Sequence, residues 1–168
     1  MQLVQLPVNI NLKQCKDMEK DHYIGVDISK KTIDVAIYVK NQAKKGAFPH
    51  ETFSNSEEGF KDMKKWLRKQ HVVLSKSLFC MEATGNYTYE LCLFLEQLGV
   101  AYSIQSPLHL KRSFGLTHGK NDKVDASRIA YYAYLHREDI KLSKLASDSV
   151  RKLKSLIAER KNLVVEIA

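Results

Sequence analysis

The sequence has few of the residues that mark linkers, disulfide frameworks or membrane spans. Its 168 residues include three cysteines, three prolines and seven glycines. The cysteines are odd in number and form no CxxC or Cys/His cluster, which argues against a disulfide framework or a zinc site and favours a reducing, cytoplasmic compartment. No apolar run approaches the ~20 residues of a membrane span. The N-terminus has no basic region followed by an apolar block, so no secretory signal is expected.

The charge, by contrast, is abundant and uneven. Lys and Arg number 27 against 19 Asp and Glu, which gives a formal net charge of +8. Residues 61–80, 109–128 and 141–168 carry net charges of +5, +3 and +4, whereas residues 81–100 carry −3. Basic blocks around an acidic centre favour a polyphosphate partner such as nucleic acid. The alternative is that the lysines, including those of the 61–69 stripe, only solubilise helix faces.

The first third of the chain predicts three antiparallel strands. Residues 22–28 and 33–39 are apolar and rich in β-branched side chains, and the polar residues 29–32 between them are typical of a turn. Residues 47–53 alternate in polarity and contain Pro49, which favours a strand at the edge of the sheet.

The rest of the chain predicts helices alternating with two more strands. Ser54 and Glu57 have the spacing of a capping box at the start of a helix that runs to about Gln70. The other predicted elements are strands 77–83 and 100–105, helices 89–98 and 122–136, a short helix from Pro107, and a last helix over 148–168.

This order of elements predicts an α/β fold with a mixed five-stranded sheet. Right-handed crossovers place the first strand in the centre, with a strand order of third, second, first, fourth and fifth (3-2-1-4-5), which is the ribonuclease-H-like arrangement. We expect this domain to cover residues 22–138. Residues 1–21 are expected to form an irregular arm, and residues 148–168 begin a helix with a coiled-coil-like apolar stripe that is still running where the sequence stops.

Four acidic residues have positions that suggest a metal site. Asp27 and Glu82 end the first and fourth predicted strands, which are parallel neighbours, so both should emerge at the same edge of the sheet. Asp122 and Asp125 stand three apart at the start of a helix and share one face. Ligands bind at the carboxyl ends of such strands. Carboxylates that converge there need a counter-charge, which Mg²⁺ supplies, and a pair of such ions can clamp a phosphodiester.

Each acid also has a simpler interpretation. Asp122 and Asp125 would be favourable at any helix N-terminus, and Asp27 could accept hydrogen bonds within the 29–32 turn. Glu82 follows directly on an apolar strand, so its carboxylate needs a partner near the core. The basic residues near these acids could contact phosphates or stay solvated. They are Lys30, Lys31, Lys111, Arg112, Lys120 and Lys123.

Three blocks of sequence, in order and spacing, resemble the motifs of one family. They are GVDISKKTIDVAI (25–37), MEATGNY (81–87) and HGKNDKVDASRIA (118–130). Together they resemble the DEDD transposases of the insertion-sequence one-ten family. The resemblance implies an N-terminal RuvC-like domain, followed by the start of a coiled coil. It carries the four acidic residues of the family onto Asp27, Glu82, Asp122 and Asp125, as ligands of Mg²⁺ with Mn²⁺ as a substitute.

The resemblance also implies partners and a reaction. Members of the family act on DNA with a structured guide RNA, called the bridge RNA, and form homodimers or higher oligomers through the coiled coil. Their C-terminal serine domain has no counterpart in these residues. The leading hypothesis is therefore the metal-binding catalytic domain of a DNA transposase or recombinase. The alternatives are a non-catalytic module for nucleic-acid binding and oligomerisation, and a stand-alone nuclease of the RuvC type.

Overall fold

A mixed five-stranded sheet forms the centre of the computed structural model. The structure describes residues 20–40, 48–83, 85–114, 122–146, 150 and 156–157. At 114 and 122–124 it describes only the backbone. The order of the strands is β3-β2-β1-β4-β5, so the predicted order is confirmed. The strands are β1 (His22–Ile28), β2 (Thr32–Val39), β3 (His50–Ser54), β4 (Ser77–Glu82) and β5 (Ala101–Gln105).

The directions of the strands decide where their ends meet. β1 pairs antiparallel with β2, and β2 pairs antiparallel with β3. β1, β4 and β5 are parallel to one another, so their carboxyl ends lie at one edge of the sheet. β3 is an edge strand, as Pro49 predicts, because a residue without an N–H cannot donate to the ladder; it spans His50–Ser54 and so begins after the proline, three residues later than the predicted start at 47.

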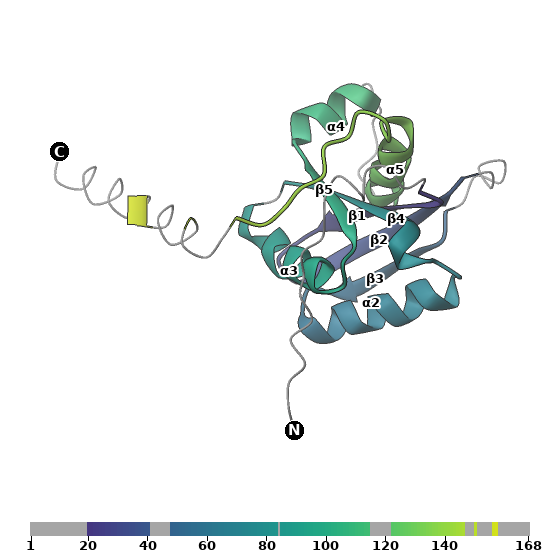
Figure 1. Ribbon diagram of the computed structural model, residues 1–168, viewed down its shortest axis with the longest axis horizontal. Helices are drawn as coiled ribbons and strands as arrows, with labels where there is room; N and C mark the ends of the chain where they lie inside the picture. Colours follow the sequence, from purple (N-terminus) through teal and green to yellow (C-terminus); the bar gives the residue numbers. More distant parts are fainter. Residues whose placement is uncertain are drawn as a thin grey trace.

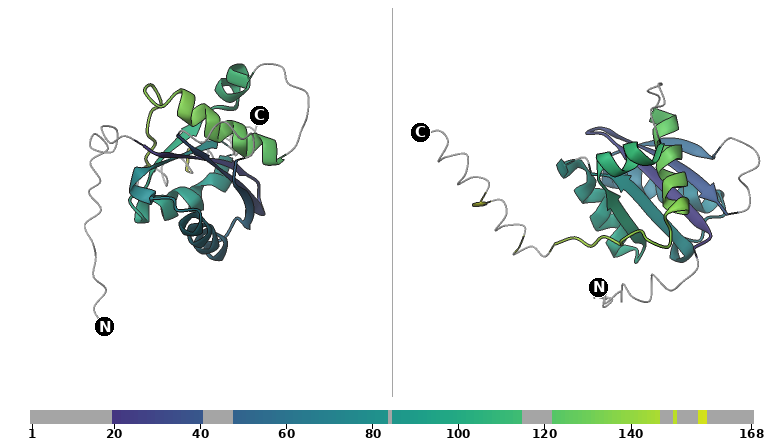
Figure 2. Two further views of the ribbon diagram at one scale, coloured as in Figure 1. Left: turned by 90° about the vertical axis from the view of Figure 1, so that its right-hand side faces the viewer. Right: turned by 90° about the horizontal axis from the view of Figure 1, so that it is seen from above.

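Two pairs of helices cover the two faces of this sheet (Figures 1 and 2). α2 (Glu57–Lys69) and α3 (Tyr89–Gln97) pack on one face, and α5 (Asp122–Leu135) with α4 (Pro107–Phe114) lies over the other. Short 3₁₀ turns, η2 (Leu74–Lys76) and η3 (Gly85–Thr88), stand on either side of β4 in the chain. The two resulting cores are separate clusters, one on each side of the sheet.

α2 is held by an apolar stripe and a serine cap. Phe60, Met63 and Leu67 are buried, as their spacing predicts. The predicted cap at Ser54 is wrong, because Ser54 ends β3 and its hydroxyl pairs with that of Ser56 at 2.9 Å. Ser56 is the N-cap residue, and its Oγ accepts a hydrogen bond from the backbone N–H of Gly59 at 3.3 Å.

The α5 helix lies unusually close to the central strand. A Cβ added to Gly25 of β1 would stand 2.0 Å from the carbonyl oxygen of Ala126 and 2.3 Å from the backbone nitrogen of Ala130. Ala126, Ala130 and Ala133 are all fully buried. Because small side chains follow this helix at the spacing of one face, its backbone can rest directly on the glycine.

After α5 the chain returns along the outer edge of β5. The Ser143 N–H donates to the carbonyl of Tyr102 at 2.8 Å, and the Ser143 hydroxyl accepts from the N–H of Ile104 at 2.9 Å. Glu96 Oε1 accepts from the N–H of Leu145 at 2.7 Å. These bonds fix the segment of residues 140–146, which lies between the predicted helices 122–136 and 148–168.

Two predictions concern the ends of the chain. Of the predicted helix over 148–168, the structure describes Val150, Leu156 and Ile157, which are helical and exposed, and the rest of that prediction lies outside the described residues. The predicted arm lies outside them too, apart from positions 20 and 21. Among the described helices, none is long and apolar enough to cross a membrane.

Candidate metal and nucleic-acid site

Asp27 and Glu82 end neighbouring parallel strands on the same face of the sheet. The register pairs Gly25 with Cys80 and Val26 with Met81, so one further step brings Asp27 level with Glu82. Side chains alternate along a strand, and this puts Asp27 on the face of Gly25, which α5 covers. Both acids are partly buried. The structure thus brings the two strand acids to one edge and one face.

The first turn of α5 reaches the same edge. Tyr134 of α5 packs against Tyr23 of β1 with ring centroids 5.4 Å apart, and Ala126 lies over Gly25, so the helix runs antiparallel to the strand. From Gly25 to Asp27 the strand advances by about 6.6 Å, and from Ala126 back to Asp122 the helix advances by about 6 Å. The backbone of the helical turn that carries Asp122 and Asp125 is therefore level with Asp27.

The described carboxylates do not by themselves complete a metal cluster. Asp125 Oδ1 lies 3.3 Å from a guanidinium nitrogen of Arg128, and the Asp125 side chain is 40% exposed. Among the side chains that the structure describes, no three of His, Cys, Asp or Glu gather in a way that could hold a metal ion. The side chain of Asp122 lies outside the described ones. The oxygen donors at this edge nevertheless have the chemistry that a hard divalent cation prefers.

A further carboxylate, Asp34, was missed by the sequence interpretation. It is the register partner of Asp27 across the β1–β2 hairpin. Asp34 Oδ1 accepts a hydrogen bond from the Thr52 hydroxyl at 2.5 Å and lies 3.4 Å from His50 Nε2. Its side chain is only 15% exposed. The signal was an acid within an otherwise apolar strand, but only the strand pairing reveals which residue it faces.

The turn that carries Lys30 and Lys31 is fixed at the same edge. The Ser29 hydroxyl bonds with Thr32 across the turn, and Ser29 Oγ also accepts from the Thr32 N–H at 3.0 Å. Asn55 donates from Nδ2 to the carbonyls of Ser29 and of Tyr87 in η3, at 2.9 and 3.2 Å. This amide joins the turn after β1 to the loop after β4. Both lysines are exposed, so they are available to phosphates.

The other predicted basic residues are only partly placed. Lys111 and Arg112 are exposed on α4, the helix that follows β5. Lys120 lies outside the described residues, and the side chain of Lys123 is not among the described ones.

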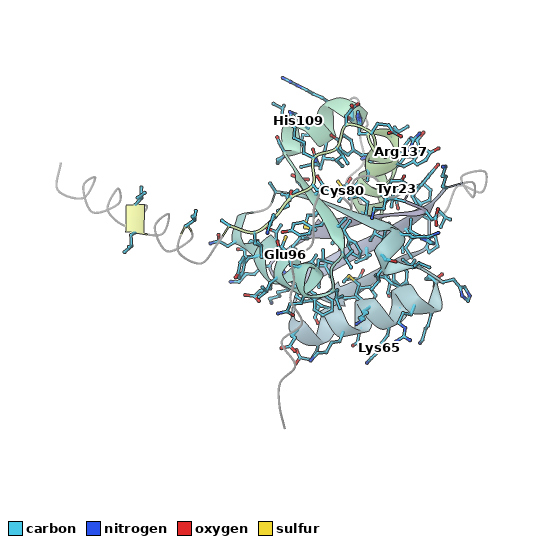
Figure 3. All side chains as sticks on the ribbon, viewed as in Figure 1. Tyr23, Lys65, Cys80, Glu96, His109 and Arg137 are labelled. Atoms are coloured by element: carbon cyan, nitrogen blue, oxygen red, sulfur yellow. The ribbon has the colours of Figure 1, made fainter. Side chains whose placement is uncertain are left out.

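The lysine stripe of α2 lies away from this site. Lys65 stands on the opposite side of the molecule from His109 of α4 and from Arg137 (Figure 3). Lys61 pairs with Glu57 at 2.7 Å, and Lys65 pairs with Asp62 at 2.9 Å. These exposed i,i+4 and i,i+3 pairs are typical of a solvated helix face.

The two described cysteines are not candidate nucleophiles. Cys80 and Cys92 are fully buried, one in each of the two cores. Burial raises the pKa of each thiol to about 12, which leaves almost no thiolate at neutral pH. The candidate chemistry of this domain therefore rests on its carboxylates.

The strand order and the position of the helices define the class of this domain as ribonuclease-H-like and RuvC-like. The structure of Thermus thermophilus RuvC in complex with a Holliday junction substrate superposes with a TM-score of 0.50. The match covers 71% of this chain and 98% of that chain, at 11% identity. This likeness shows the fold.

The sequence then gives the family. Residues 24–168 match the model of the DEDD transposase family of the IS110 type, described as a transposase, and the chain belongs to that family. The pilin gene-inverting proteins of Moraxella bovis and Moraxella lacunata are each 31% identical to it over 143 residues. These alignments cover 83% of this chain but 42% of each relative, so the chain spans less than half of their length.

Proposed function

We propose that this chain is the metal-dependent catalytic domain of a DNA transposase or recombinase, with Asp27, Glu82, Asp122 and Asp125 as the ligands of a divalent cation. One observation carries the proposal: the two strand acids share an edge and a face of the sheet with the start of the helix that bears Asp122 and Asp125. Membership of a transposase family supports it. We infer Mg²⁺ as the resident ion and Mn²⁺ as its substitute, because both accept carboxylate oxygens.

Each protein group has a definite part in this proposal. A bound divalent ion would supply Lewis acidity toward the phosphodiester and lower the pKa of a bound water. Asp27 and Glu82 offer oxygens from strands that the sheet holds rigid, and Asp125 offers one from α5. Lys30 and Lys31 hold neighbouring phosphates from their fixed turn, and Lys111 and Arg112 extend the basic surface. Arg128 orients the Asp125 carboxylate through their ion pair.

We further propose DNA, with a structured guide RNA, as the partner of this surface. The relatives are named for gene inversion, and the solved RuvC structure holds a Holliday junction. The guide RNA, and assembly as a homodimer or higher oligomer through residues 148–168, rest on the family resemblance. Sedimentation of the chain with and without that segment tests the assembly, since a difference in mass is expected.

The site is tested by metal binding and by cleavage of a four-way DNA junction. Calorimetry should detect Mn²⁺ binding by the 168-residue chain, and Asp27→Asn and Glu82→Gln should each weaken it by about 100-fold or more, since each replaces a charged ligand oxygen by a neutral amide. Glu58→Gln on α2 is the matched control, because Glu58 is exposed in α2, which packs on the opposite face of the sheet. Unchanged Mn²⁺ binding in both site variants would overturn the assignment.

The junction assay separates the three candidate functions. Metal-dependent cleavage by the chain alone supports the stand-alone nuclease. Cleavage that requires added guide RNA or the remainder of a longer relative supports the transposase domain. Binding of the junction that falls steeply with salt, without cleavage under any of these conditions, supports the non-catalytic module.

A further inference from the structure

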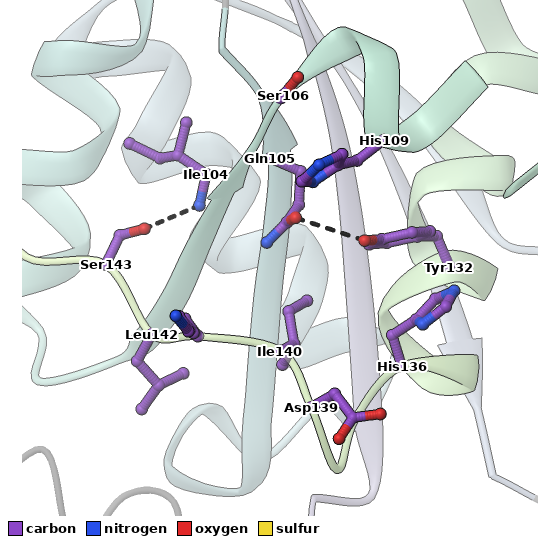
Figure 4. Close-up of a pocket in the computed structure, with 11 residues that line it drawn as sticks. Ile104, Gln105, Ser106, His109, Tyr132, His136, Asp139, Ile140, Leu142 and Ser143 are labelled. Carbon is purple, nitrogen blue, oxygen red and sulfur yellow. Dashed lines mark hydrogen bonds between the residues drawn. The ribbon is translucent and has the colours of Figure 1, made fainter. Parts of the chain in front are cut away.

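A cavity of about 490 Å³ lies beside the candidate catalytic edge (Figure 4). Its walls come from the end of β5, the first turns of α4, the second half of α5 and the segment of residues 139–143. Pockets of this size accept small organic ligands.

The cavity and the candidate metal site meet where the ends of β4 and β5 lie side by side. Gln105 lines the cavity, and it is the register partner of Glu82 across β4 and β5. Register partners project from the same face of a sheet, so the Gln105 amide lies on the face of the Glu82 carboxylate. A strand held at that carboxylate is therefore within one strand spacing of the cavity, which is about 4.8 Å.

Flat polar side chains line part of the cavity, and apolar side chains form the rest of its wall. The Gln105 amide is held in place, since its Oε1 accepts from the Tyr132 hydroxyl at 3.3 Å and its Nε2 donates to Ser103 Oγ at 2.6 Å. One N–H and one lone pair of this amide remain for a ligand. The rings of Tyr132 and His136 pack with centroids 4.4 Å apart, and the exposed His109 ring adds a further flat surface from α4 (Figure 4).

These features fit an aromatic ring with a hydrogen-bonding edge better than a metal ion. His109, His136 and Asp139 all line the cavity, yet within the described part of the chain no three such side chains are gathered to hold a metal. A nucleobase, by contrast, stacks on aromatic and imidazole rings and pairs its edge with a glutamine amide. Lys111 and Arg112, two and three residues after His109 on α4, are exposed and suit the phosphates on either side of such a base.

We propose that this cavity receives one unpaired nucleobase of the strand that is held at the catalytic edge. This inference rests on the proposed function, because it takes the strand at the catalytic edge to be a nucleic-acid strand. The base enters between His109 and Tyr132, and its edge meets the free N–H and lone pair of Gln105. A paired base cannot enter, since it must leave its stack to do so. The cavity would thus favour junctions and ends over continuous duplex.

The test compares two duplexes with a one-nucleotide overhang. One carries 2-aminopurine in the overhang and the other carries an abasic residue, and each is made with a DNA and with an RNA overhang to identify the source of the base. The 168-residue chain should bind the 2-aminopurine duplex roughly 10-fold more tightly, with a change in 2-aminopurine fluorescence. His109→Ala should remove this preference, and His109→Phe should restore most of it, because it restores a ring. Gln105→Met should reduce the preference without affecting binding of the abasic duplex.

The controls separate this proposal from the proposed function. Leu108→Ala changes the neighbouring exposed residue of α4, outside the cavity lining, and should keep the full preference. Equal affinity of the wild-type chain for both duplexes, or equal effects of His109→Ala and Leu108→Ala, overturns the cavity proposal even if Mn²⁺-dependent cleavage is found. A preference for the base in a chain that binds no Mn²⁺ and cleaves the junction under none of the conditions above supports the cavity and removes the proposed function. A preference with only one overhang assigns the base to DNA or to RNA.

Discussion

Asp27 and Asp34 face each other as register partners across the β1–β2 hairpin, so two acidic side chains project side by side from one face of the sheet. Like charges in directly opposite positions destabilise a sheet. Thr52 offsets part of this cost at Asp34 through its hydrogen bond at 2.5 Å. The pair thus concentrates negative charge at the edge where we propose a cation, and we expect Asp34 to contribute charge there without being a ligand.

The first prediction concerns Asp34. Asp34→Asn keeps an oxygen that can accept from Thr52 but removes one negative charge beside Asp27. We expect Mn²⁺ binding to weaken by about 10-fold, less than for Asp27→Asn, because the charge is lost but no ligand is. Calorimetric titration of both variants measures the difference. Equal losses would make Asp34 a ligand, and no loss would remove it from the site.

The second prediction concerns the contact between β1 and α5. Gly25→Ala would force a methyl group into the backbone of α5, and overpacking of this kind costs about 1–3 kcal/mol or more. The free energy of unfolding from urea denaturation should fall accordingly. Adding Ala126→Gly should not restore it, because the clash is with the Ala126 carbonyl oxygen and not with its methyl group. Recovery in the double variant would contradict the close approach of the α5 backbone to Gly25.

The third prediction concerns pH. Burial lowers the pKa of His22 below its usual value of 6.5. The unfolded chain therefore binds more protons than the folded chain as the pH falls through 6.5, so this group stabilises the fold above that pH and the contribution is lost below it. Urea denaturation at pH 7.5 and 5.5 should show a smaller drop for His22→Gln than for wild type. His71→Gln, at an exposed position, should show the full drop, and identical drops in all three chains would contradict the prediction.

The fourth prediction concerns thiol reactivity. Because burial raises the pKa of Cys80 and Cys92 to about 12, neither should react with a disulfide reagent at pH 7.5 in the folded chain. Cys15 lies outside the described residues, so the measurement uses Cys15→Ser. Both remaining thiols should titrate at once when guanidinium is added. Rapid reaction of either thiol before unfolding would show that its core opens readily.

Much of the fold could be predicted from sequence because strong local signals agreed. Apolar runs predicted the strands, Pro49 predicted the edge strand, and the predicted helix 89–98 is α3 (Tyr89–Gln97), which is followed by Gly99 with a φ of 69°. The cap of α2 was predicted wrongly because several capping residues compete within three positions. Ser54 has Glu57 three residues on, whereas Ser56, the true cap, has Gly59 there.

The site was harder to predict than the fold, because it depends on pairing between distant residues. Asp27 and Glu82 were identifiable because each ends an apolar strand. Asp34 and Gln105 were missed, since their relation to these acids appears only in the strand register. Gly25 was an ambiguous signal as well, because a glycine inside a strand marks either a bulge or a close backbone approach.

The return of residues 140–146 along β5 has a consequence for how copies of this domain meet. Exposed sheet edges are templates for aggregation. On the β5 side, the outward-facing carbonyl of Tyr102 and the outward-facing N–H of Ile104 are already hydrogen-bonded to Ser143. The opposite edge is the five-residue β3, which follows directly on a proline. Extension of the sheet from one copy to the next is therefore disfavoured on both sides, so we do not expect this domain to form fibres through its sheet edges.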